Sequence, residues 1–372
     1  MPNLLKKIAL GKERYPALTG VRAVGASVVF FDHFTLWPGE HVVINVMAFF
    51  FLLSGFLIAR IYYAQAQLSA PWLWVYFVNR FARIYPVYFL LLSVAVLLSH
   101  GLRPWTLFSN YTLTHALFHG TPLLIQPSWS LTVEECFYFL APGFMLLARR
   151  YNFLAPLALG GLLLAGALAV SRLGFAFLGT SELVMSTTFF GHFAEFFAGF
   201  WLALRVIKLE QRGPLRVQGC KRTVLGLAGV CILIGAMVLV YRQPRLDVVP
   251  IIAINNFLIP IPVAVLYEGL MTEDTFLVRW LSGRLIGLLG RASYSFYLMH
   301  SLVIDHLSVP FLPVDSHRVL SVLFSLGFTW VLSVLLFACY EEPVNLFLRR
   351  ALSGRVSDGK RLAPTGVFDG RS

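Results

Sequence analysis

The chain has 372 residues, of which 58% are hydrophobic, 15% aromatic and only 13% charged, and its mean hydropathy is +0.74. A soluble globular chain is roughly half apolar and about one quarter charged, so this composition excludes a cytosolic enzyme, a disordered tail and a collagen-like fibre, and indicates a protein whose solvent is the lipid bilayer. The formal net charge of +12 would suit a nucleic-acid partner, but the distribution of the basic residues argues against one.

Ten stretches have the length and apolarity of a membrane-spanning helix, which needs about 20 mostly apolar residues. In chain order they cover about 17–37, 42–61, 84–100, 129–148, 152–170, 185–204, 223–241, 248–268, 285–305 and 319–340. The eighth contains three prolines, which membrane helices tolerate where neighbouring groups satisfy the freed carbonyls. The sequence therefore predicts an all-α, polytopic membrane protein with about ten transmembrane helices.

The Lys and Arg residues between these stretches predict the orientation of the chain. Of the 30 basic residues, 24 fall on one side and five on the other, and Arg22 lies inside the first span. Cytoplasmic loops carry the excess of Lys and Arg, so both termini are expected in the cytoplasm. The positive charge then reports topology, and no nucleic-acid partner is expected.

The first span carries the most informative ionisable residues, which are costly in a membrane and are functional candidates by default. Arg22 and His33 are about 20° apart around a helix and about 16 Å apart along it. A guanidinium suits phosphate recognition, and an imidazole can take a proton near neutral pH. Asp32 lies about 100° away around the helix and is a weaker candidate, for orienting His33. A structural interpretation stays open, in which Arg22 reaches the interface and His33 satisfies a neighbouring carbonyl.

Two further segments combine charged and apolar residues. Arg80 and Arg83 in NRFARIYP share a helix face at the expected cytoplasmic entrance of the third span, either as part of a binding site or as ordinary interfacial anchors. Glu134 in SWSLTVEECFYFL lies a few residues into an apolar helix. It either complements the dipole of a helix start capped by Ser128 or Ser130, or takes part in substrate binding.

The remaining ionisable residues within spans have weaker signals. His300 ends SYSFYLMH, and Glu342 precedes a proline at the inner end of the last span; each is a candidate for substrate binding or for a structural role. His192 and Glu195 share a helix face as a metal pair would, but no third ligand is evident, so no metal is expected. The four cysteines have no regular spacing and support neither a disulfide scaffold nor a zinc site.

Taken jointly, six segments resemble the membrane acyltransferase-3 family, whose bacterial members O-acylate carbohydrates. They occur in the family's order and cover about residues 14–345. They are RYPALTGVRAVGASVVFFDH at 14–33, FFFLLSGFLI at 49–58, NRFARIYPVY at 79–88, PSWSLTVEECFYFLAP at 127–142, LLGRASYSFYLMHSLVI at 288–304 and YEEPV at 340–344. Residues 1–345 are therefore expected to form an acyltransferase-3 transmembrane domain, and residues 346–372 a short, basic and disordered cytoplasmic tail.

The resemblance implies a ten-helix bundle that moves an acyl group, usually acetyl, from acyl-coenzyme A to a sugar hydroxyl. By motif match, His33 takes the catalytic position, and the acyl-coenzyme A site takes Arg22, Arg80 and Arg83. Glu134 and Glu342 match family carboxylates.

These assignments fit the cytoplasmic location of the donor, and they suggest His33 as general base, with a covalent acyl-histidine relay as the open alternative. The expected co-substrate is acyl-coenzyme A, with no bound cofactor. The expected acceptor is a glycan or glycolipid, such as exopolysaccharide, lipopolysaccharide or a nodulation factor, and the expected location is the bacterial inner membrane. The rival interpretation is a polytopic transporter or flippase of a glycan or lipid, because buried charges and proline-broken helices suit that class too.

Overall fold

The computed structural model describes residues 14–33, 46–118, 120–173, 179–213, 215, 217–241, 249–308 and 314–353. Helices account for nearly all of the regular structure in these ranges, and the β-structure within them is one isolated bridge between Val217 and Glu273. The predicted all-α class is confirmed for the part of the chain that is described.

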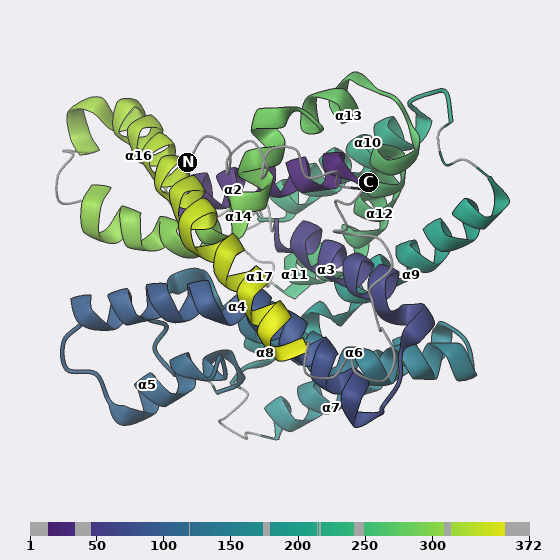
Figure 1. Ribbon diagram of the computed structural model, residues 1–372, viewed down its shortest axis with the longest axis horizontal. Helices are drawn as coiled ribbons and strands as arrows, with labels where there is room; N and C mark the ends of the chain where they lie inside the picture. Colours follow the sequence, from purple (N-terminus) through teal and green to yellow (C-terminus); the bar gives the residue numbers. More distant parts are fainter. Residues whose placement is uncertain are drawn as a thin grey trace.

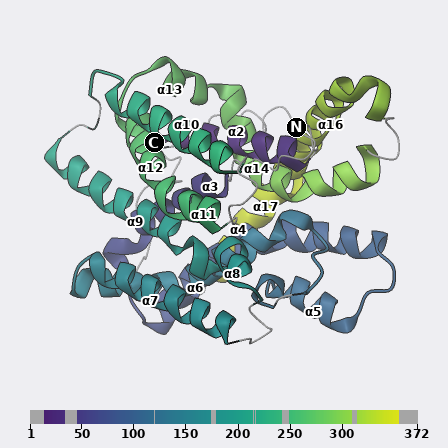
Figure 2. The same cartoon turned by 180° about the vertical axis from the view of Figure 1, so that it is seen from behind.

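The described helices can be followed in chain order in Figures 1 and 2. The α-helices are α2 (Pro16–His33), α3 (Met47–Tyr62), α4 (Ala70–Leu98), α5 (Pro104–Tyr111), α6 (Trp129–Arg150), α7 (Leu154–Arg172), α8 (Ser181–Thr187), α9 (Phe189–Arg212), α10 (Lys221–Tyr241), α11 (Val249–Ala253), α12 (Pro260–Thr272), α13 (Phe276–Leu281), α14 (Arg284–Val303), α16 (Val314–Leu336) and α17 (Glu342–Ser353). Short 3₁₀ turns are η1 (Tyr63–Gln65), η2 (His115–Leu117) and η3 (Gln126–Ser128), and π-helical turns are η4 (Ile254–Leu258), η5 (Ile304–Ser308) and η6 (Phe337–Glu341).

Eight helical segments in the described ranges are long and apolar enough to cross a membrane. Each of the ten predicted stretches overlaps helix within its described residues, and the predicted positions 34–37, 42–45 and 248 lie outside the described ranges. Helices α2 and α14 are outside the group of eight. Polar side chains lower the hydropathy of both helices. Those of α2 include Arg22, Asp32 and His33. These two helices carry much of the candidate site. The polar residues that they contribute to the site also lower their hydropathy.

The third predicted stretch begins too late. Helix α4 begins at Ala70, with Pro71 in its first turn, a position that proline favours. It then runs through Pro86 to Leu98. Arg80 and Arg83 therefore lie in the middle of a 29-residue helix, not at its entrance.

The prolines of the eighth stretch are accommodated by a local change of helix type. Helix α11 passes into the π-helical turn η4, where the Ile259 N–H donates to the Ile254 carbonyl over 3.0 Å, and Pro260 then begins α12. A π-helical adjustment of this kind satisfies carbonyls that proline would otherwise leave unpaired.

The end of the last span also differs from the prediction. Helix α17 continues to Ser353, so the predicted tail at 346–372 begins inside a helix; residues 354–372 lie outside the described ranges. The Trp74 indole N–H of α4 donates to the Leu352 carbonyl over 3.1 Å and holds α17 against α4.

Close helix packing brings distant parts of the chain together. Helix α2 packs on α14, and α3 packs on α9 (Figure 1). A Cβ atom on Gly290 would lie 2.0 Å from the Thr19 carbonyl oxygen, and one on Gly199 would lie 1.9 Å from the Leu52 carbonyl oxygen. Glycine is required at both crossings, since small residues allow membrane helices to approach this closely.

Candidate active site

Five helices surround a cavity of about 130 Å³. Its lining comes from α2, α3, α4, α6 and α14, and much of it is apolar. The ionisable side chains that line it are Arg22, Arg80, Arg83, Glu134, Tyr138, Tyr294 and Tyr297. The structure thus brings all three of the predicted donor-binding arginines, and one predicted carboxylate, to a single cavity.

Arg83 is held by a buried carboxylate. Its Nη1 donates to Glu341 Oε1 over 2.7 Å, and Glu341 Oε2 accepts a 2.6 Å hydrogen bond from Ser295 Oγ. The Arg83 guanidinium also lies over the ring of Tyr294, 5.6 Å from its centroid. The carboxylate that contacts Arg83 is therefore Glu341, whereas Glu342, which the sequence analysis selected, does not line the cavity.

Arg80 lies between two aromatic rings. Its guanidinium is 5.5 Å from the ring centroids of both Tyr62 and Tyr138, a cation–π arrangement, and its Nη2 donates to Tyr62 Oη over 3.4 Å. Its Nε is buried and has no hydrogen-bond partner among the described residues. The rings hold the charge in place without using up all of its donors.

The Glu134 side chain lines the cavity and forms its hydrogen bonds there, and it does not cap the start of a helix. Its Oε1 accepts hydrogen bonds from Ser54 Oγ on α3 and Tyr138 Oη one turn further along α6. Helix α6 begins at Trp129, with no acidic residue in its first turn. The hydroxyls of Ser128 and Ser130 donate to the carbonyls of Ile125 and Pro127 before α6, so neither caps the helix. The capping hypothesis was wrong.

His33 and His300 form a pair, and neither is among the residues that line the cavity. Their ring centroids are 4.9 Å apart, and His300 Nε2 lies 3.4 Å from His33 Nδ1. His300 Nδ1 donates to the Tyr297 carbonyl over 2.7 Å, and His33 Nδ1 donates to the Val29 carbonyl over 2.9 Å. When both rings are neutral, each Nδ1 carries the proton and each Nε2 carries the lone pair. The Nε2 lone pair of His300 then faces His33, and the Nε2 lone pair of His33 is not used by either bond.

Tyr297 connects the histidine pair with the cavity. Its ring lines the cavity, its hydroxyl lies 2.7 Å from Ser130 Oγ, and its carbonyl is the acceptor for His300. His300 is buried, whereas His33 is exposed at the end of α2. Asp32, the weaker candidate next to His33, does not line the cavity.

The sequence analysis did not select several residues of the site. Tyr138 lies four residues after Glu134 in a segment already selected, so helical spacing could have indicated their contact. Tyr62 and Glu341 carry no comparable local signal. Their contacts with Arg80 and Arg83 join positions 18 and 258 residues apart.

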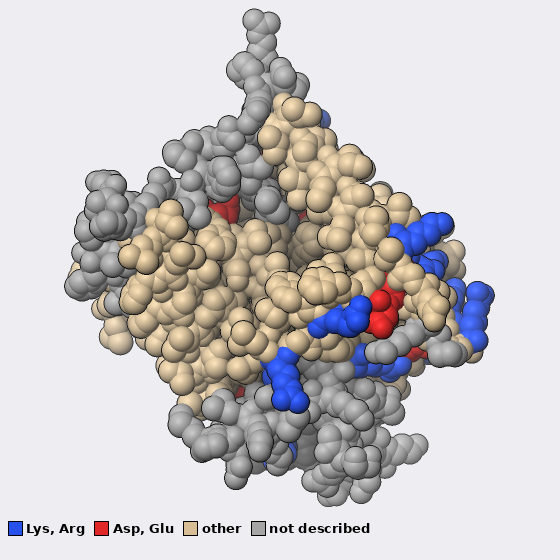
Figure 3. Space-filling view, turned by 90° about the horizontal axis from the view of Figure 1, so that it is seen from above, with Lys and Arg blue, Asp and Glu red and all other residues tan. Residues whose placement is uncertain are grey.

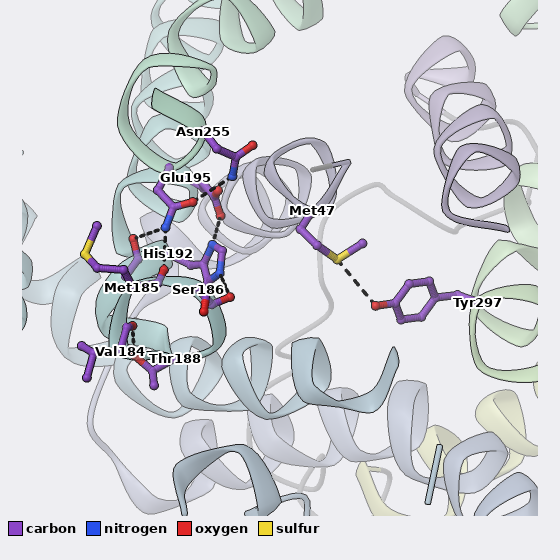
Figure 4. Close-up of polar contacts among 11 residues, drawn as sticks. Met47, Val184, Met185, Ser186, Thr188, His192, Glu195, Asn255 and Tyr297 are labelled. Atoms are coloured by element: carbon purple, nitrogen blue, oxygen red, sulfur yellow. Dashed lines mark hydrogen bonds and ion pairs between the residues drawn. The ribbon is translucent and has the colours of Figure 1, made fainter. Parts of the chain in front are cut away.

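A second polar cluster, formed by His192, Glu195 and Asn256, lies where α8, α9 and η4 meet. Figure 4 shows His192 and Glu195 in this cluster. His192 Nδ1 contacts Glu195 Oε2 at 2.9 Å, and His192 Nε2 donates to the Ser186 carbonyl at 2.9 Å. Asn256 Nδ2 donates to the Met185 carbonyl at 2.7 Å. Both ring nitrogens of His192 are thus occupied, and the described residues contain no group of three potential metal ligands. This cluster joins helices.

Comparison with known proteins adds independent findings. The profile of the acyltransferase-domain family Acyl_transf_3 matches residues 15–338. A peptidoglycan O-acetyltransferase OatA of Listeria monocytogenes is 24% identical over 368 residues, which cover 89% of this chain and 56% of that protein. The chain therefore spans about half the length of this relative. No solved structure gives a significant match to the chain.

Proposed function

The chain belongs to the acyltransferase-3 family, and from this premise we propose that it moves an acyl group, acetyl in the simplest case, from acyl-coenzyme A to a hydroxyl group of a sugar. Family membership makes the protein an acyltransferase, and its apolar helices make it a multi-pass membrane protein. The proposal concerns three further points: acyl-coenzyme A as the donor, a sugar hydroxyl as the acceptor, and a location in the bacterial inner membrane. An enzyme of this family is favoured over the transporter that the buried charges also suited.

The observation that carries the proposal is the convergence of Arg22, Arg80 and Arg83 on one cavity, which Tyr297 links to a histidine pair. Coenzyme A carries several phosphate charges, and a guanidinium binds phosphate through paired hydrogen bonds. Arg22 and His33 are separated by about 16 Å along α2, roughly the reach of the pantetheine arm. Phosphates held at the arginines would therefore allow the thioester to reach His33.

We assign His33 Nε2 the role of general base. It takes the proton of the sugar hydroxyl as the oxygen attacks the thioester carbonyl carbon. Collapse of the tetrahedral intermediate breaks the carbon–sulfur bond, and the coenzyme A thiolate takes the proton from the imidazolium. His300 acts as a positioning residue, because its Nε2 lone pair faces His33 Nδ1 and favours the tautomer in which Nε2 is the free base. An acyl-histidine relay would use the same nitrogen as nucleophile.

The acceptor is proposed to be a glycan or glycolipid of the cell envelope or a secreted sugar. The relative from Listeria is a peptidoglycan O-acetyltransferase by name, which supports a sugar hydroxyl as the acceptor class. Exopolysaccharide, lipopolysaccharide, nodulation factor and peptidoglycan all present such hydroxyls.

The test is transfer of label from acetyl-coenzyme A into glycan. Membranes containing the full chain are supplied with the donor labelled in its acetyl group, and surface and secreted glycans are compared by mass spectrometry with and without the gene. We expect a mass difference of one acetyl group on one glycan class and recovery of the label in it. Glycans of unchanged mass that accumulate on one side of the membrane would favour the transporter and contradict the proposal.

A further inference from the structure

Helix α17 carries an inward-facing polar stripe that the proposed function has not used. Glu342, Asn345 and Arg349 follow one another at spacings of three and four residues, so they share a helix face. Asn345 is 6% exposed, Arg349 is half-buried, and Phe347 on the opposite side is 67% exposed. The helix therefore buries polar side chains and presents apolar ones outward, which suits contact with lipid.

The buried stripe faces the arginines of the candidate site. Helix α17 lies along α4, as the yellow and blue helices in Figure 1 show, and the bond from Trp74 to Leu352 fixes this contact. Arg349 lies half-buried on α17, which packs against α4, the helix that carries Arg80 and Arg83. Two helices in contact thus carry three guanidinium groups, although like charges repel one another.

The described residues leave part of this cluster unsatisfied. Glu341 is occupied by Arg83 and Ser295. The Nε atoms of Arg80 and Arg349 and the Asn345 Oδ1 are buried and have no hydrogen-bond partner among the described residues. Buried polar atoms are nearly always paired, so atoms without partners require an explanation. A polyanionic ligand with its own hydrogen-bond donors would satisfy all three and offset the repulsion.

We propose that Arg349 is a further phosphate-binding residue of the donor site, and that the polar stripe of α17 forms the wall against the nucleotide part of acyl-coenzyme A. This inference rests on the proposed function, because it takes the donor from there. Helix α17 lies beyond residues 15–338, which the family profile matches, so the packing of α17 on α4 is what points to Arg349.

The chain offers a matched control in the next residue. Arg350 is exposed, has the same charge and occupies the same helix. Full-length wild type, Arg349→Gln, Arg349→Lys and Arg350→Gln are purified in detergent, and the Kd for coenzyme A is measured at several salt concentrations. Thermal unfolding of each variant without ligand controls for folding.

We expect Arg349→Gln to raise the Kd for coenzyme A about tenfold or more, as loss of a charged hydrogen bond would. The dependence of its Kd on salt should weaken, since a phosphate contact is lost. Arg349→Lys should give a smaller rise, because lysine keeps the charge but not the fork. Arg350→Gln should match wild type. A purely structural role would lower the unfolding temperature of Arg349→Gln and leave the salt dependence unchanged.

The outcomes separate this inference from the proposed function. If wild type binds coenzyme A and Arg349→Gln binds it equally well, only the role of Arg349 is overturned. If Arg349→Gln cannot be purified, the Arg349→Lys variant decides in the same way, and an unchanged Kd overturns the inference. If wild type binds no coenzyme A, the proposed donor is wrong and the inference falls with it.

Discussion

His33 and His300 meet edge to face, and two bonds to helix carbonyls decide where their protons lie. Their geometry separates the roles of the two rings. His300 is buried and points a lone pair at its neighbour, whereas His33 keeps a basic nitrogen at the accessible end of α2. The two arginines of α4 also differ in their contacts. Arg83 forms an ion pair with Glu341, whereas Arg80 lies between two aromatic rings and its Nε has no hydrogen-bond partner among the described residues.

The general-base role predicts that His33→Gln is nearly inactive. Glutamine can still donate to the Val29 carbonyl but cannot accept a proton at neutral pH, so acetyl transfer should fall by about a hundredfold or more. Transfer is measured in membranes at matched expression, with His100→Gln, an exposed histidine outside the cavity lining, as the control. Near-normal transfer by His33→Gln would contradict the role of base.

At the scale of elements, local departures from the α-helix place the site residues. The π-helical turn η6 ends at Glu341, directly before α17. Single-turn π-bulges inside α-helices occur often at functional sites, and this one sets both the contact of Glu341 with Arg83 and the face that α17 turns toward α4. The start of α10 is likewise set by a residue distant in sequence, Glu273, which follows α12.

A changed register in η6 should disconnect α17 from the site. Insertion of one alanine after Cys339 adds a residue to the turn and rotates the following residues by about 100°, so Glu341 leaves Arg83. We expect acetyl transfer to fall by about tenfold or more, because a charged hydrogen bond is lost. Cys339→Ala at the same exposed position should be fully active. Equal activity of the insertion and the substitution would show that the register of η6 does not matter.

The carboxylate of Glu273 should give the protein an acid-sensitive helix cap. It accepts hydrogen bonds from the backbone N–H groups of Arg222 over 2.7 Å and Thr223 over 2.9 Å at the start of α10. Burial acts to raise the pKa of Glu273, but these hydrogen bonds outweigh it and hold the pKa below the usual 4.5. Because the folded pKa is the lower one, the contribution to stability is present above about pH 4.5 and is lost as the pH falls through the folded pKa.

Glu273→Gln should therefore lower the free energy of unfolding at pH 7 by about 1 kcal/mol, as loss of a helix cap does. Below pH 4.5 its difference from wild type should shrink. Thermal unfolding in detergent at the two pH values measures both effects. Asp274→Asn is the matched control, since Asp274 is exposed and its nearest cation, Arg279, lies 3.8 Å away. A constant difference between wild type and Glu273→Gln at the two pH values would show that the cap does not titrate.

At the scale of the whole molecule, charge is unevenly distributed. Glu210 at the end of α9 binds Arg14 and Arg60, and Glu268 near the end of α12 binds Arg205 and Arg222. The four basic residues were all assigned to the cytoplasmic side from the sequence. In the space-filling view, the charged side chains gather on one side of the face, and most of the remaining described surface is uncharged (Figure 3).

This asymmetry predicts the topology, because basic residues are retained in the cytoplasm. Reporters fused after Ser372 and inserted in the loop between Arg212 and Lys221 should read cytoplasmic. A reporter inserted at Gly120, in the loop after α5, should read external. Activity of paired reporters, one active only in the cytoplasm and one only outside, makes the measurement. An external reading at Ser372 would contradict the prediction of about ten spans.

The sequence by itself determined the membrane class, the helical class and the set of residues to consider, because hydropathy and charge act locally along the chain. It also placed Arg22, Arg80, Arg83 and Glu134 among the candidates, and the structure brings these four to one cavity. Ionisable residues in apolar helices stand out without knowledge of their partners.

Only the tertiary structure decided which of these residues meet. Glu341 and Glu342 are adjacent and chemically identical, yet the register of η6 turns Glu341 toward an arginine 258 positions away. Glu134 had two open interpretations, a role at the helix start and a role in substrate binding, until α3 placed Ser54 beside it. Arg349 had no interpretation of its own in the sequence, and only the packing of α17 on α4 makes it a candidate. Hydrogen bonds and ion pairs require contact at about 3 Å, and contact between distant positions is a property of packing that no local pattern encodes.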